Sequence, residues 1–183
     1  WSDLARLFER LPPHAIEAEM CLLGSVLIDP QSLGDAVLVV RNGDEFYKPA
    51  HTAIYDAMIE LYDQSASVEI VQLNQLLADR ACLDTIGGTD YLVELASQVP
   101  SAAHVQHYAR LVHEKAIVRH LIEAAGEILY EAYHEPDQAQ ELLDRAEQRI
   151  FDIANQRDST DIESMSQLIH QTMAMLEANE GRR

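Results

Sequence analysis

Apolar residues recur at helical spacing along most of the chain, and Pro, Gly and turn residues divide this pattern into segments. Helices are predicted near 14–28, in a short stretch after Asp29-Pro30, near 49–63 and 69–81, and from Thr89 to just before Pro100. Asp29 and Thr89 are the expected caps of two of them, and Pro30 fits a first helical position. The residues expected to face a common core are Ile16, Met20, Leu23, Leu27, Leu33, Val37, Val40, Ala50, Ile54, Ala57, Met58, Leu61, Ile70, Leu73, Leu76 and Leu77.

The pattern changes after Ser101, which can cap a helix of about 30 residues. A turn at His134-Glu135-Pro136 leads into a return helix near 136–156. Two long helices joined by a tight turn form an antiparallel hairpin. The side chains expected to pack within this hairpin or between subunits are Leu111, Val118, Leu121, Ala125, Ile128, Leu143, Ala146 and Ile150.

A last amphipathic helix is predicted at about 161–178, where Thr160-x-x-Glu163 matches a capping box. Its apolar side follows a complete hairpin, so it has no obvious partner in the sequence. No stretch alternates apolar and polar residues as a strand does. We therefore predict an all-α fold with four parts: an N-terminal extension (1–13), a compact helical head (14–100), the hairpin (101–156) and a linker with its helix (157–183).

Charge and composition narrow the possible partners. The chain has 183 residues, 48% of them hydrophobic, and a net charge of −18 with only two lysines, Lys48 and Lys115. A surface that follows nucleic-acid phosphates needs clustered Lys and Arg, so this domain is not expected to grip DNA itself. No apolar run approaches the roughly 20 residues of a membrane span. No signal peptide opens the chain, and the two cysteines, Cys21 and Cys82, are expected to be buried thiols in a reducing cytoplasm.

A row of acidic residues marks the long helix. Glu123, Glu127, Glu131 and Glu135 are spaced four apart and share one helix face, and no Lys or Arg occurs between Glu123 and Asp144. Such a row costs helix stability. It is either a solvated face that aids solubility or a docking surface for a basic partner, whose encounter it would steer.

Catalytic motifs are absent from the sequence. It contains no GxxxxGK[ST] phosphate loop, no GxSxG elbow and no HExxH helix. His104 and His107 can share a helix face, but two imidazoles without a third ligand make a poor zinc site. Glu131-x-x-His134 occurs once, whereas a di-iron bundle needs that spacing twice. We expect no catalytic, cofactor-binding or metal-binding residues in this chain.

Five short motifs follow one another in a fixed order. They are Ile16-Glu17-Ala18-Glu19, Phe46-Tyr47-Lys48-Pro49-Ala50-His51, Ile86-Gly87-Gly88-Thr89-Asp90-Tyr91-Leu92, Val99-Pro100-Ser101-Ala102-Ala103 and Tyr108-Ala109-Arg110. Each is weak alone, but the ordered set resembles the N-terminal domain of the DnaB family of bacterial replicative DNA helicases. The resemblance extends from Leu11 to about Leu176 and is strongest between Ile16 and Ala116.

The resemblance implies a domain that assembles and docks proteins in the cytoplasm. In that family N-terminal domains form a collar, often a trimer of dimers, and receive the primase and in some bacteria the loader. ATP and Mg²⁺ belong to a separate motor, which unwinds DNA 5′ to 3′ and would begin about where this chain stops. The linker helix binds the neighbouring subunit's motor, a role that would fall here on Met165, Leu168, Ile169, Thr172 and Leu176.

The glutamate row is not part of the family pattern. We assign primase docking to the hairpin and expect reversal of Glu127 and Glu131 to Lys to weaken it. Two other interpretations remain: a free-standing helical adaptor without a motor, and an all-α metalloenzyme. A Walker loop encoded beyond Arg183 would favour the helicase, and a stop codon there would favour the adaptor. Stoichiometric bound metal would favour the metalloenzyme.

Overall fold

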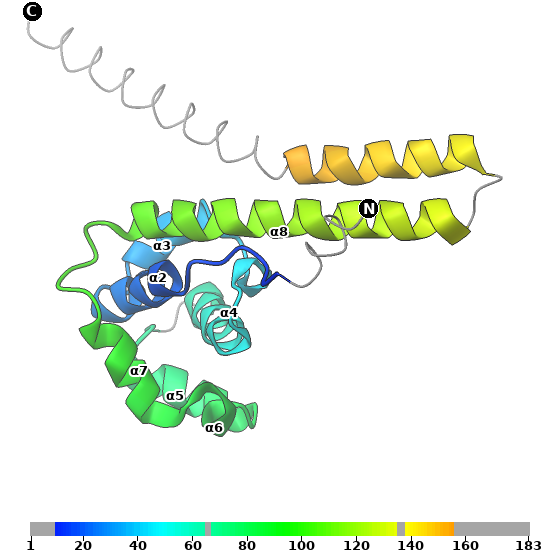
Figure 1. Cartoon of the computed structure of the whole chain (residues 1–183). Helices are drawn as coiled ribbons and strands as arrows, with labels where there is room; N and C mark the ends of the chain where they lie inside the picture. The colour runs from blue at the N-terminus through cyan, green and yellow to red at the C-terminus, as the bar shows by residue number, and fades with distance from the viewer. Residues whose placement is uncertain (1–9, 65–66, 135–137, 156–183) are drawn as a thin grey trace, which may run out of the picture. The chain divides into compact units, whose positions relative to one another are not determined.

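The computed structural model describes residues 10–64, 67–134 and 138–155 (Figure 1). Every regular element within those ranges is helical, which confirms the predicted all-α class. The chain divides into two compact units, one ending at Arg119 and the other beginning at His120. The linker region at 157–183, including the five predicted motor-docking residues, lies outside the described part of the chain.

The first unit holds a succession of short helices. In order they are α2 (Ile16–Ile28), α3 (Ser32–Val37), the 3₁₀ turn η1 (Gly43–Glu45), α4 (Pro49–Asp63), α5 (Ile70–Asp79), α6 (Leu83–Ile86) and α7 (Gly88–Ser97). The helix α8 (Val105–His134) begins in this unit and ends in the second. The predicted helices agree with these bounds to within a few residues. The sequence pattern missed η1 and α6, because elements of three or four residues are too short to show a helical period.

Three predicted caps have other roles. Asp29 ends α2, and its Oδ1 accepts a hydrogen bond from the N–H of Gln31, so it stabilises the turn before α3. Thr89 lies inside α7, whose N-cap is Gly87 in a left-handed conformation, and its hydroxyl donates to Asn74. Ser101 precedes a turn at 102–104, and α8 begins only at Val105.

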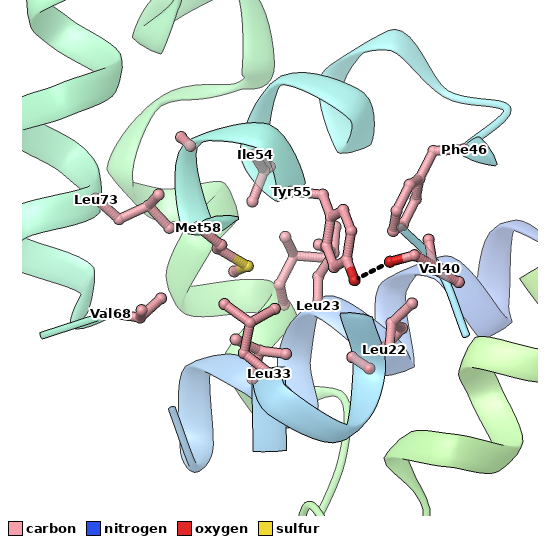
Figure 2. Packing of buried hydrophobic residues seen from close by; sticks show 14 of the residues in the cluster. Leu22, Leu23, Leu33, Val40, Phe46, Ile54, Tyr55, Met58, Val68 and Leu73 are labelled. Carbon is pink, nitrogen blue, oxygen red and sulfur yellow. Dashed lines mark hydrogen bonds between the residues drawn. The ribbon is translucent and has the colours of Figure 1, made fainter. Parts of the chain in front are cut away.

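Leucines and other apolar side chains from α2, α3, α4 and α5 form the core of the first unit (Figure 2). Tyr55 also lies in it, and its hydroxyl donates a hydrogen bond of 2.7 Å to the carbonyl of Val40. Helix α4 buries His51 and Tyr55 in addition to the predicted stripe, while Ala50 is only partly buried. The prediction overlooked His51 and Tyr55, because the polar atoms of their side chains made these positions resemble a solvated face.

The first turns of α8 complete this core. Val105, Ala109, Val112 and Ala116 are buried in the first unit. Burial of these residues ties the start of α8 to the head, so the division between units falls at 119/120. The sequence pattern placed it at 100/101 because a continuous helix carries no composition break where its packing partner changes.

The second unit contains the end of α8 and a helix at 139–155. Ala124 is buried, while Ile128, Leu142, Ala146 and Ile153 are partly buried. Arg145 and Arg149 on the second helix pair with Glu131 on α8. These contacts join the two helices, as the predicted hairpin requires.

Candidate docking surface and the motif network

A buried polar network connects three of the five sequence motifs. The carboxylate of Glu19 on α2 lies 2.6 Å from Nδ1 of His51 on α4, and both side chains are almost fully buried. The same carboxylate accepts the backbone N–H of Tyr47 at 2.7 Å and of Lys48 at 3.4 Å. A buried carboxylate is tolerated only with such partners, so Glu19 fixes the segment that leads into α4.

Tyr91 on α7 extends the network. Its hydroxyl lies 2.8 Å from Nε2 of His51 and accepts a hydrogen bond of 2.9 Å from the Lys48 ammonium. The ammonium also lies 4.5 Å from the centre of the Tyr91 ring. Donors and acceptors match when His51 carries its proton on Nδ1 and Tyr91 donates to Nε2. These motif residues therefore hold α2, α4 and α7 together.

A second polar cluster fixes the chain as it enters α2. Arg119 donates from Nη1 to the carbonyl of Pro13 at 2.8 Å and from Nη2 to the carbonyl of Glu45 at 2.6 Å. The Glu45 carboxylate in turn lies 2.5 Å from Nδ1 of His113. His14 stacks on the Tyr47 ring with 4.5 Å between centroids. The segment before α2 is thus bound to α8 through its backbone.

Ion pairs on the hairpin change the interpretation of the acidic row. Glu131 pairs with Arg149 at 2.5 Å and with Arg145 at 3.2 Å, and Glu127 pairs with Arg149 at 3.1 Å. The hydrogen bond from Arg149 is the main reason that the pKa of Glu131 is lowered, and the same bond raises the pKa of Arg149. No Lys or Arg lies near these glutamates in the sequence, and the arginines that pair with them lie on the returning helix at 139–155. Glu123 is exposed, with no ion pair to the described residues. Glu135 lies outside the described ranges.

Large apolar side chains remain exposed on the hairpin. Leu143 is 55%, Ile150 45% and Phe151 59% exposed on the helix at 139–155. Of the predicted packing residues, Val118, Leu121 and Ala125 are also exposed, Ile128 and Ala146 are partly buried, and Leu111 packs against the head core. Because Leu143 and Ile150 are seven apart, they share one helix face. The hairpin therefore presents an apolar face that its own two helices do not cover.

Two hollows accompany this surface. One, of about 550 Å³, is lined by Glu123, Gly126, Glu127, Tyr130, Glu131 and Arg149. The other, of about 480 Å³, lies along Ala146, Glu147, Ile150, Phe151 and Ala154. The arrangement suits protein contact, because apolar side chains lie beside carboxylates and arginines.

The structure also describes the histidines and cysteines that the sequence analysis singled out. His104 and His107 are exposed near the start of α8, and the described part of the chain contains no cluster of three or more ligand side chains suited to a metal. Cys21 and Cys82 are free and only partly buried, and burial raises the pKa of the Cys21 thiol. Among the helices described, none combines the length and apolar character needed to cross a bilayer.

Comparison with known proteins defines the class of this all-helical domain. Residues 11–114 match the family described as the DnaB-like helicase N-terminal domain. The chain is 35% identical over 177 residues to the replicative DNA helicase DnaC of Bacillus subtilis, covering 97% of this chain and 39% of that protein. It is 37% identical over 180 residues to the replicative DNA helicase DnaB of Geobacillus stearothermophilus, covering 98% and 39%.

Solved structures agree with the sequence comparison. The crystal structure of the N-terminal domain of DnaB helicase from Mycobacterium tuberculosis superposes with a TM-score of 0.74 at 37% identity, covering 78% of this chain and 99% of that one. A structure of a DnaB-like replicative helicase and its interactions with primase gives a TM-score of 0.63 at 26% identity, covering 82% and 35%. The chain belongs to the DnaB-like helicase N-terminal domain family, and it spans about 39% of the length of these two relatives.

Proposed function

We propose that this chain is the collar and docking part of a hexameric replicative helicase, which joins subunits and receives primase during DNA replication. The observation that carries the proposal is the uncovered apolar face of the hairpin, with Leu143, Ile150 and Phe151 exposed. Exposed apolar patches of this kind mark protein contacts. Unwinding, with its ATP and Mg²⁺, belongs to the motor expected in the full-length protein, and the cytoplasmic location stays a prediction.

Self-association through this face can be tested by a substitution that introduces one charge. Ile150→Asp places a carboxylate within the apolar face, whereas Asn155→Asp adds the same charge to the same helix at an exposed polar position. We expect Ile150→Asp to shift sedimentation towards monomer at concentrations where the parent protein and Asn155→Asp associate. Equal association of all three proteins would reject the hairpin as the subunit contact.

Primase docking is assigned to the acidic side of the hairpin, because the exposed carboxylates there can attract a basic partner. The chain's acidic surface also supports the proposal that this domain does not bind DNA directly. Loader docking is proposed for the same collar from family membership alone.

The ion pairs make Glu123 the sharpest position for a primase test. Replacing Glu131 would also break contacts with Arg145 and Arg149, so lost binding could reflect a damaged hairpin. Glu123→Lys leaves those pairs intact, and Glu141→Lys on the returning helix is a matched reversal. Calorimetry with the cognate primase should show affinity falling about two- to fivefold for Glu123→Lys, the range for an exposed pair. Unchanged affinity, or an equal fall for Glu141→Lys, would contradict the assignment.

The motor-docking role of Met165, Leu168, Ile169, Thr172 and Leu176 is proposed from family membership. The free-standing adaptor is the alternative, and sequencing of the gene beyond Arg183 separates the two. The length of the relatives supports the helicase, because their matched part is the N-terminal portion of a longer protein.

A further inference from the structure

An apolar hollow of about 560 Å³ lies beside the start of α2 in the first unit. Ala15, Ala18 and Cys21 line it from α2 and the residue before it, while Tyr108 and Leu111 line it from α8. Ala15, Tyr108 and Leu111 pack against the core on one side but are only partly buried. The hollow can therefore accept further apolar side chains.

The apolar surface continues from the hollow along α8. Val118 lies seven residues after Leu111, so the two side chains share one face of the helix, about 10 Å apart along its axis. Val118 is 42% exposed and belongs to the first unit. The spacing of seven residues equals that between the first and last anchors of an amphipathic helix bound in a groove. Tyr108, Leu111 and Val118 therefore form an apolar stripe of a length that suits such a helix.

Two carboxylates and one ammonium group flank this stripe. Glu17 is exposed and lines the hollow from α2, and Glu114 is exposed on α8, three residues after Leu111. Lys115 is the exposed base beside them, four residues after Leu111. The whole chain carries a net charge of −18, so the electrostatic field around the surface attracts a basic molecule. Charge thus favours an occupant that combines apolar side chains with Lys or Arg.

The same charge argues against a second copy as the occupant. Among the described helices, none contains more Lys and Arg than Asp and Glu, and α5 and α7 contain no Lys or Arg at all. The helix at 139–155 exposes apolar side chains, but its acids outnumber its two arginines, Arg145 and Arg149. A copy docked through any of these helices would bring carboxylates towards Glu17 and Glu114, and juxtaposed like charges disfavour binding.

We propose that the hollow and the adjoining stripe of α8 dock a basic amphipathic helix of another protein. Apolar side chains of that helix pack against Tyr108, Leu111 and Val118, and a Lys or Arg beside them pairs with Glu17. The docking residues all belong to the first unit, so they differ from those proposed for subunit and primase contacts on the hairpin. The inference does not depend on the hairpin's proposed role.

A designed peptide serves as the probe. A fluorescein-labelled helix of about 15 residues carries Leu at i, i+3 and i+7 and Lys at the neighbouring positions. Its matched analogue carries Glu in place of each Lys. On titration with the full chain, the anisotropy of the Lys peptide should rise to saturation. The Lys peptide should bind about fivefold or more tightly than the Glu peptide, because the Glu peptide meets like charges.

Substitutions in the surface test where the peptide binds. Val118→Ser removes an apolar side chain from the stripe, and Val93→Ser makes the same change at an exposed position of α7, outside the surface. Val118→Ser should weaken binding of the Lys peptide about tenfold, the factor that corresponds to burial of one valine side chain. Glu17→Lys should weaken it about two- to fivefold, with Glu94→Lys on α7 as the control. Both control variants should bind as the parent protein does.

Two cysteines report on occupancy of the hollow. Both are free and partly buried, but only Cys21 lines the hollow. A saturating concentration of the Lys peptide should slow the alkylation of Cys21 by iodoacetamide and leave the Cys82 rate unchanged. All variants should keep the parent thermal transition, which shows that the head is folded.

The absence of saturable binding, equal affinity for the Lys and Glu peptides, or unchanged affinity in Val118→Ser would overturn the proposal. Protection of Cys21 that grows with protein concentration in the absence of peptide would also overturn it, because the occupant would then be a second copy. Ile150→Asp should bind the Lys peptide as tightly as the parent protein does. Failure of the hairpin proposal and failure of this docking proposal therefore give different results.

Discussion

Glu19 and His51, separated by 32 residues in sequence, approach to 2.6 Å between Oε2 and Nδ1 in the interior of the head. Glu19 belongs to the first sequence motif and His51 to the second, and Tyr91 of the third binds the other side of the imidazole. The first three motifs therefore share one spatial arrangement, in which each of the three supplies a member of a single hydrogen-bonded network.

Removing the Glu19 carboxylate should destabilise the head strongly. Glu19→Ala leaves His51 and the N–H of Tyr47 without their buried acceptor, and losing one partner of a buried pair costs roughly 3–5 kcal/mol. Glu17→Ala on the same turn removes an exposed carboxylate and should change the free energy of unfolding by less than about 0.5 kcal/mol. Urea unfolding followed by circular dichroism measures both. Similar losses in the two variants would show that the network is not a stabilising unit.

Tyr55 should control stability at alkaline pH. Burial is the main reason that the pKa of this phenol is raised well above its ordinary value, with help from Glu45. A raised pKa in the folded state means that the contribution is fully present below the unfolded pKa of about 10 and is lost as pH rises above it. Tyr55→Phe should therefore cost about 1 kcal/mol near pH 7, through loss of the bond to Val40.

The same substitution should flatten the alkaline side of the stability curve, because Phe cannot ionise in the unfolded chain. The measurement is urea unfolding at several pH values between about 7 and 11. Parallel curves for the parent protein and Tyr55→Phe would contradict the assigned role of burial.

Arg149 should control the ionisation of Glu131. The pKa of Glu131 is lowered chiefly by the hydrogen bond from Arg149, so the pairing stabilises the hairpin above the unfolded pKa and is lost as pH falls through the lower folded value. In Arg149→Met the Glu131 carboxyl should titrate at higher pH than in the parent protein. Carboxyl-detected NMR titration of the two proteins measures the difference. An unshifted Glu131 titration would mean that the ion pair is not formed in solution.

Sequence periodicity predicted the elements that depend on local pattern. Helix α4 runs from Pro49 to Asp63, as predicted, because a proline at its start and an apolar stripe define it within the segment itself. The Glu131–Arg149 pair could not be predicted, since its residues lie on different helices whose register is set by tertiary packing. The partners of the buried His51 could not be predicted for the same reason, because Glu19 and Tyr91 lie 32 and 40 residues away.

Two helical glycines should respond to alanine in opposite ways. A Cβ on Gly24 would overlap the carbonyl oxygen of Leu95, where α2 approaches the backbone of α7, whereas nothing lies within 4 Å of a Cβ on Gly126. Gly24→Ala must separate two helices and should cost about 3 kcal/mol. Gly126→Ala should stabilise the hairpin by roughly 0.5–1 kcal/mol, because alanine loses less backbone entropy in a helix. Thermal and urea unfolding of both variants test this directly, and a Gly24→Ala protein as stable as its parent would mean that α2 and α7 do not pack this closely.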